Sequence, residues 1–276
     1  MEKIKIHIYM VFRYSILIIA AVTALFPILY VVINSFLSPS EAQATYESVS
    51  GSYVKLKLVP DMVTLEQYYQ AFFRSPRYLE LFWNSVVITV PIVAGQVVFC
   101  SLAAYAFAKL EFPGRDKIFV VFIILLTLPP QSSLVANYIM LDRMKLVGNY
   151  LSILLPGIFS AFGVCLLRQY MRYIPNECME AARIDGAGRF RTFWNILLPQ
   201  AKGGIGTLII LSFIDNWNMI EQPLILLKDA SKYPMSVVLS NMQVNSGVFA
   251  FAIIFMIPPL IIYLIFEKDF VKGFKL

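Results

Sequence analysis

The 276-residue chain has few of the residues that carry most enzyme chemistry. His7 is its only histidine, which excludes histidine-based catalysis in the apolar parts of the chain. Three cysteines, Cys100, Cys165 and Cys178, suggest neither a disulfide framework nor a metal site. No Gly-rich loop ends in Gly-Lys-Ser or Gly-Lys-Thr, so the chain lacks a phosphate-binding loop of its own. The chain therefore shows no metal site and no phosphate-binding loop of its own, and any energy source for it must lie elsewhere.

Charged residues are also scarce, at 14% of the chain, whereas soluble domains contain about 25%. Apolar residues make up 59%, and they form runs of about 18–25 residues, the length that crosses a bilayer. Such runs must be helical, because lipid offers their backbone groups no other partners. We predict an all-α polytopic membrane protein with a single transmembrane domain over residues 1–276. The six predicted spans are Tyr14–Phe36, Ser85–Ala108, Ile118–Leu141, Leu151–Leu167, Gly203–Ile220 and Phe249–Phe266.

Two pairs of prolines interrupt these spans. Pro129-Pro130 falls in the third and Pro258-Pro259 in the sixth. Neighbouring helices can satisfy the backbone groups that such breaks release. We favour a simple kink at each pair over a gating hinge.

The net charge of +6 is explained better by signals at the span ends than by nucleic-acid binding. Basic residues are more numerous on one predicted side, which comprises both termini and the second and fourth loops. That side is expected to be cytoplasmic, which places the first loop, at about residues 37–84, outside. Within this loop, residues 63–73 have apolar residues at helical spacing, and Thr64 is a candidate N-cap.

The fourth loop, at about residues 168–202, is the most polar and basic segment of the chain. Pro175 and Glu177 suit the start of a helix, and Gly186 suits its end. Ala181 and Ala182 carry minimal side chains, which would let another protein surface approach that helix closely. A second short helix is expected at about residues 189–196, ending before Pro199. Without further information, a cytoplasmic helical hairpin with no partner is an equal alternative.

Asp215-Asn216-Trp217-Asn218 is a polar and aromatic cluster in the fifth span. It lies on the order of 20 Å from Lys202 along a helix. Polar groups at such depth commonly line a cavity, and Trp with Asn suits a sugar ring and its hydroxyls. Hydrogen bonding between helices in an interfacial aromatic belt explains the cluster equally well. Apart from Asp215 no carboxylate lies in a span, which disfavours a proton- or sodium-coupled carrier.

The fourth loop resembles the EAA loop of the permease subunits of ABC importers. Glu180-Ala181-Ala182 is followed by Gly186 after three residues, and then by Ile196, Leu198 and Pro199, at the spacing of that motif. Other segments resemble the carbohydrate (maltose-type) permeases in particular. They are Leu58-Val-Pro60, Trp83-Asn-Ser85, Ala103-Ala-Tyr-Ala-Phe107, Phe112-Pro-Gly-Arg115 and Ser212-Phe213 with Trp217-Asn218 and Pro223-Leu224.

The resemblance implies a type I importer permease in a bacterial cell membrane, which is not itself an enzyme and holds no cofactor or metal. It implies a second permease subunit, two cytoplasmic ATPase subunits that bind ATP and Mg, and an extracytoplasmic sugar-binding protein. The implied ATPase dock is Glu180, Ala181, Ala182, Asp185 and Gly186. The implied substrate pathway includes Asn216, Trp217 and Asn218. The chain stops at Leu276, before the longer tail often seen in this subfamily. An importer of a non-sugar solute remains an alternative, as does a channel or secondary carrier outside the ABC class.

Overall fold

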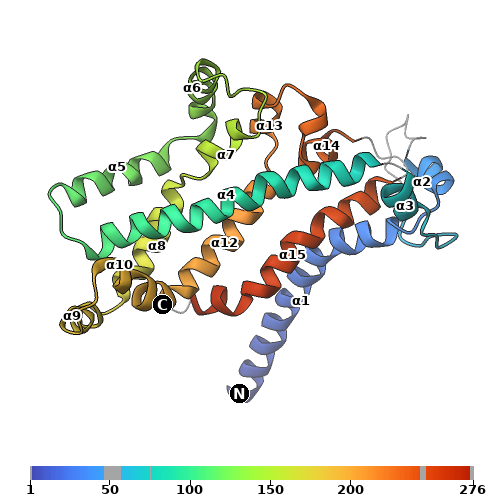
Figure 1. Cartoon of the computed structure of the whole chain (residues 1–276). Coiled ribbons are helices and arrows are strands. Elements are labelled where there is room, and N and C mark those ends of the chain that lie inside the picture. The colour runs from blue at the N-terminus through green and yellow to red at the C-terminus, as the bar shows by residue number, and fades with distance from the viewer. Residues whose placement is uncertain (1, 47–56, 75, 243–246, 274–276) are drawn as a thin grey trace. The chain divides into compact units, whose positions relative to one another are not determined.

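The computed structural model describes residues 2–46, 57–74, 76–242 and 247–273, and these residues form helices and no strands (Figure 1). Among the described residues, four helices are long and apolar enough to cross a membrane, and the number rises to six if each of two sharply bent helix pairs forms one span. The four are Tyr9–Asn34 of α1 (Glu2–Asn34), α4 (Pro76–Lys109), the stretch Leu151–Tyr173 and Val248–Val271 of α15 (Val248–Gly273). The all-α membrane fold expected from the sequence is confirmed.

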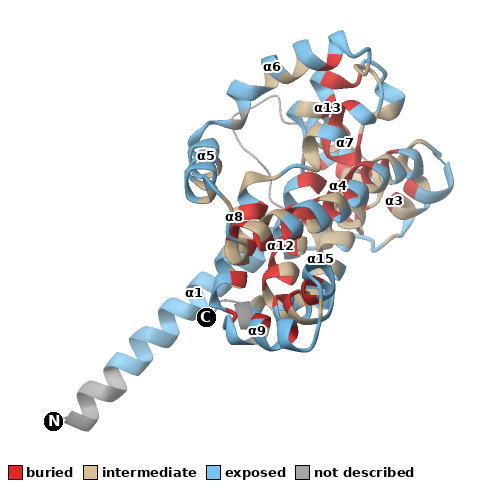
Figure 2. Ribbon diagram, turned by 60° about the vertical axis from the view of Figure 1, so that its left-hand side comes forward, coloured by how far each residue is buried: buried red, intermediate tan, exposed pale blue. Residues whose placement is uncertain are grey.

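The chain divides into two compact units. The first comprises residues 1–79 and 241–256, and contains α1, α2 (Pro39–Tyr46) and α3 (Glu66–Tyr69). Along α1 from Tyr9 to Leu29 every residue is exposed, as the pale blue ribbon shows (Figure 2). An apolar helix with this exposure in the described part of the chain fits a lipid or partner environment.

The segment that follows α1 packs onto the end of that helix through a polar side chain. Gln67 is fully buried, and its amide donates to the backbone oxygens of Asn34 and Leu37, at 2.9 Å each. Lys57 forms ion pairs with Glu41 at 2.7 Å and with Asp61 at 2.6 Å, and its hydrogen bond lowers the pKa of Asp61.

The prediction that Thr64 caps a helix is wrong. The Thr64 hydroxyl is buried without a hydrogen-bond partner, and Leu65 occupies the cap position of α3.

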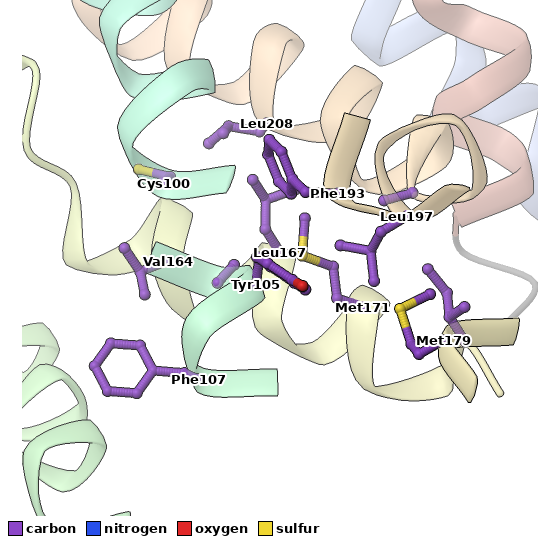
Figure 3. Packing of buried hydrophobic residues seen from close by; sticks show 13 residues of the cluster. Cys100, Tyr105, Phe107, Val164, Leu167, Met171, Met179, Phe193, Leu197 and Leu208 are labelled. Carbon is purple, nitrogen blue, oxygen red and sulfur yellow. The ribbon is translucent and has the colours of Figure 1, made fainter. Parts of the chain in front are cut away.

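The second unit comprises residues 80–240 and 257–276. Its main core lies between the C-terminal half of α4, α8 (Ala161–Tyr173) and α12 (Lys202–Trp217), and Figure 3 shows the side chains that meet there. A Cβ atom on Gly163 would lie 2.8 Å from Cys100 Sγ, so the glycine permits α4 and α8 to pack closely. A smaller cluster joins α4 to α6 (Pro130–Arg143), α7 (Leu151–Gly157) and α13 (Glu221–Leu226). α14 (Met235–Asn241) follows, and the Met235 amide donates to Ser85 Oγ.

The two proline pairs behave differently. Pro129-Pro130 does not kink one helix but separates α5 (Arg115–Thr127) from α6, with a bend of 106°, so the kink prediction is wrong here. Leu128 and Pro129 each precede a proline, which disfavours helical backbone, and both are extended at ψ 129° and 133°. Pro258 and Pro259, in contrast, lie inside α15, which continues without interruption.

Candidate functional site

The segment between α8 and α12 is a compact chain of short helices. It comprises α9 (Glu177–Ile184), α10 (Arg189–Thr192), a π-helical turn (Phe193–Leu197) and α11 (Leu198–Gln200). Helical structure therefore continues past the predicted end at residue 196 and includes Pro199. The proline is tolerated because it lies in the first turn of α11. A bend of 75° then leads into α12. Single π turns of this kind are frequent at functional sites.

α9 presents one face to the core and one outward. Met179 and Ala182 are buried, whereas Glu180, Ala181 and Ile184 are exposed. Ile184 is 86% exposed, an unusual position for a large apolar side chain in a polar loop. Of the two small residues, Ala181 is thus available to another surface, while Ala182 lets α9 lie close to its own chain.

The end of α9 is a Schellman motif centred on Gly186. The Ala187 amide donates to the Ala182 carbonyl at 2.8 Å, and the Gly186 amide donates to the Arg183 carbonyl at 3.0 Å. Gly186 has φ +76°, a left-handed conformation that side chains disfavour. The predicted helix stop at Gly186 is confirmed. Asp185 and Gly186 are both exposed at this end.

The last turns of α4 hold this segment at two points. The Lys109 ammonium donates to the Ile174 carbonyl and to Asn176 Oδ1, directly before α9. Tyr105 donates to the Arg189 carbonyl at 3.3 Å, directly after the α9 turn, and its ring lies 5.3 Å from that of Phe193. Figure 3 shows Tyr105, Phe193 and Met179 in this cluster. The residues on both sides of α9 are therefore attached to the end of α4, and this attachment fixes the direction in which the exposed face of α9 points.

The second candidate cluster lies at the C-terminal end of α12. Trp217 is 1% exposed, stacks on Phe213 with ring centroids 5.3 Å apart and meets Phe82 edge-on at 5.8 Å. Asn216 is buried and donates to the Ser212 carbonyl at 2.8 Å. Asn218, just beyond the helix, is exposed. Of the three residues only Asn218 is exposed, and its amide donates to the Ile214 carbonyl at 2.7 Å.

A buried polar network connects this cluster to the break between α7 and α8. Ser212 donates to Gln96 Oε1 at 2.6 Å, and the Gln96 amide donates to the Gly157 carbonyl at 2.7 Å. Gly157 is the last residue of α7, so its carbonyl lacks a partner in its own helix. Gln96 therefore supplies a hydrogen bond that the apolar surroundings cannot provide.

Sequence reasoning missed Tyr105, Lys109 and Gln96. Nothing local in the sequence marks Lys109, because its partners lie more than 60 positions away. Gln96 did have a signal, since a lone amide in an apolar span commonly bonds to another helix. The exposed apolar side chains at Ile184, Phe190 and Trp194 were likewise not singled out.

Comparison with known proteins agrees with a membrane permease of this construction. Residues 71–275 match the family of binding-protein-dependent transport system inner membrane components. The arabinooligosaccharides transport system permease protein AraQ of Halalkalibacterium halodurans is 28% identical, over 92% of this chain and 90% of its own length. The sn-glycerol-3-phosphate transport system permease protein UgpE of Brucella melitensis is 30% identical, over 94% and 93% respectively.

A solved structure shares the fold. A bacterial ABC transporter involved in the import of the acidic polysaccharide alginate superposes with a TM-score of 0.80. The match covers 96% of this chain and 97% of that chain, at 24% identity.

The fold and the relatives define a multi-pass transport permease rather than an enzyme. This chain belongs to the family of binding-protein-dependent transport system inner membrane components.

Proposed function

We propose that the chain is the permease subunit of an ATP-driven importer of a sugar or oligosaccharide. The observation that carries the proposal is α9, a short helix that exposes Ala181 between charged and apolar side chains, ends in a Schellman motif and is attached at its N-terminal end to α4. The permease family and the substrates of the arabinooligosaccharide and alginate transport systems support the sugar assignment.

The proposed ATPase dock is the outward surface formed by Glu180, Ala181, Asp185 and Gly186, with Ala182 packed beneath it. Two cytoplasmic ATPase subunits would bind ATP and Mg, one of them seated on this surface. Exposed Ile184 and Phe190 supply apolar area, and the two carboxylates supply charge for basic residues of the partner. Lys109 and Tyr105 would transmit ATPase closure to α4 and so to alternating access.

The proposed pathway runs past the end of α12. Asn218 would meet the hydroxyls of the sugar, while Trp217 and Asn216 hold the α12 end in place. A second permease subunit would complete the pathway, and an extracytoplasmic sugar-binding protein would deliver the substrate. Both termini would be cytoplasmic, since basic residues are concentrated on that side.

The alternative is a non-sugar solute, which the glycerol-3-phosphate relatives favour. The test uses the complete complex, with partner permease, ATPase and binding protein, reconstituted in proteoliposomes. ATP-dependent uptake of a labelled oligosaccharide, competed by other sugars but not by glycerol 3-phosphate, is expected. Uptake of glycerol 3-phosphate alone would overturn the sugar assignment. Solute uptake by the chain without the ATPase would overturn the importer assignment.

A further inference from the structure

A cleft of about 270 Å³ lies where α4 ends, α5 begins and α8 approaches its end. It is separate from the α9 surface and from the α12 cluster. Its lining consists of two apolar residues of α4 and four charged residues: Phe107, Ala108, Arg115, Asp116, Arg168 and Arg172.

The charges in this cleft are unbalanced. Asp116 lies 3.1 Å from Arg115 Nε and 3.7 Å from Arg168 Nη2, so one carboxylate is shared between two guanidinium groups. Arg172 adds a third guanidinium, and no hydrogen bond or ion pair of it occurs among the residues described. A cleft with this excess of guanidinium groups favours an anion, and guanidinium suits phosphate in particular because it binds two oxygens at once.

Part of the cleft is already held in position. Arg168 has a side chain only 16% exposed, its Nε donates to the Phe107 carbonyl at 3.3 Å, and its guanidinium lies 3.6 Å from the ring centroid of Phe119. Arg172 stands one helical turn further along α8 and is exposed. One guanidinium is therefore fixed and a second is free to turn toward a ligand.

The surroundings of the cleft favour a lipid over a dissolved ion. Arg115 is the first residue of α5, and α5 has no buried residue along its length. Its exposed apolar side chains, which could lie against acyl chains, are Ile118, Val120, Val121, Ile123, Ile124, Leu125 and Leu126. The basic residues lie at the ends of apolar helices, which is the depth of lipid headgroups.

We propose that this cleft binds the phosphate group of an anionic phospholipid. Arg172 and Arg115 bind the phosphate oxygens, Arg168 forms the base of the cleft, and the acyl chains lie along α5. Asp116 competes with the phosphate for the same guanidinium groups and so limits the affinity.

The test is binding of phosphatidylglycerol to the purified, assembled complex in detergent, measured by native mass spectrometry against phosphatidylcholine. Arg172→Gln is expected to weaken phosphatidylglycerol binding by about tenfold, because it removes one charge-assisted contact. Asp116→Asn is expected to strengthen it. Lys202→Gln, which removes an exposed cation outside the cleft, is the matched control and should leave binding unchanged.

Several outcomes would overturn the proposal. Equal losses in Arg172→Gln and Lys202→Gln would mean that only general surface charge attracts the lipid. Full competition by millimolar inorganic phosphate would identify a site for a free anion. Loss of a partner subunit in Arg172→Gln, with lipid binding unchanged, would assign the arginines to a protein contact. Because the readout is lipid binding, none of these results depends on which solute the complex imports.

Discussion

Lys109, the last residue of α4, donates a hydrogen bond of 2.8 Å to the side chain of Asn176, the residue that precedes α9. Asn176 would ordinarily use that oxygen to cap its own helix, and no such cap bond is present. The Asn176 side-chain oxygen instead accepts a hydrogen bond from Lys109 at the end of α4. A movement of α9 is thus opposed by, or passed to, α4.

We predict that Lys109→Met lowers the amount of solute transported per ATP hydrolysed by roughly tenfold, because it removes hydrogen bonds from a charged donor worth about 1.5–3 kcal/mol. The substitution keeps much of the apolar stem, so the complex should still assemble. Uptake and ATP hydrolysis are measured together in proteoliposomes. Lys117→Met, at an exposed cation of α5, is the control. Normal coupling in Lys109→Met would mean that α4 does not carry the movement of α9.

Two nearby glycines allow a sharp test of the dock. Gly186 has φ +76° and Gly188 has φ −67°, and an added Cβ meets nothing within 4 Å at either one. Gly186→Val must therefore change the backbone, at about 1–2 kcal/mol for the left-handed conformation alone, whereas Gly188→Val need not. We predict that the transmembrane helices of the Gly186→Val variant still fold, but that the variant loses ATP-coupled transport.

Gly188→Val should transport at close to the normal rate. Co-purification with the ATPase shows whether each variant still docks. Normal assembly and transport by Gly186→Val would mean that the dock lies elsewhere on the loop. Equal failure of both variants would indicate that the loop tolerates no added bulk.

The EAA segment was predictable because its information is local. The helix and its stop at Gly186 follow from spacing within a few turns, although Pro175, expected in the first turn, precedes α9, which begins at Glu177. The sequence could not predict which side of α9 packs against the core and which side is exposed. Ala181 and Ala182 look equivalent in the sequence, and only packing against the core decides that Ala182 is buried.

For the membrane spans, too, some features could be predicted from the sequence and others could not. Their existence follows from apolar length, but the sharp break after Thr127 was underestimated, because two successive prolines impose extended backbone on two residues rather than one. The sequence left Trp217 with two equal interpretations, a sugar contact or a structural aromatic contact, and the structure covers it with neighbouring rings from α4 and α12. A single sequence does not tell an aromatic residue that binds a ligand from one that fills a core.

The predicted orientation can be tested by labelling single cysteines on intact, wall-stripped cells with a reagent that does not cross the membrane. Met62→Cys, at a position 69% exposed, should react from outside, and Glu111→Cys should react only after lysis. The native cysteines are replaced first, with Cys100→Ala because that thiol packs against Gly163. Ser50, in the loop predicted to be external, lies outside the described residues. The reverse labelling pattern would invert the topology, including the proposed dock.

The last prediction separates the two roles assigned to the α12 cluster. Trp217→Ala removes a ring with 1% exposure and two aromatic neighbours, so it should destabilise the complex by about 3–5 kcal/mol and lower its thermal midpoint. Trp217→Phe should restore part of that loss. Asn218→Leu changes an exposed side chain, so it should leave the thermal midpoint nearly unchanged while raising the KM for the sugar. Both quantities are measured on the same assembled preparations. An unchanged KM in Asn218→Leu would mean that Asn218 does not contact the sugar. A raised KM with normal stability in Trp217→Ala would mean that Trp217 does.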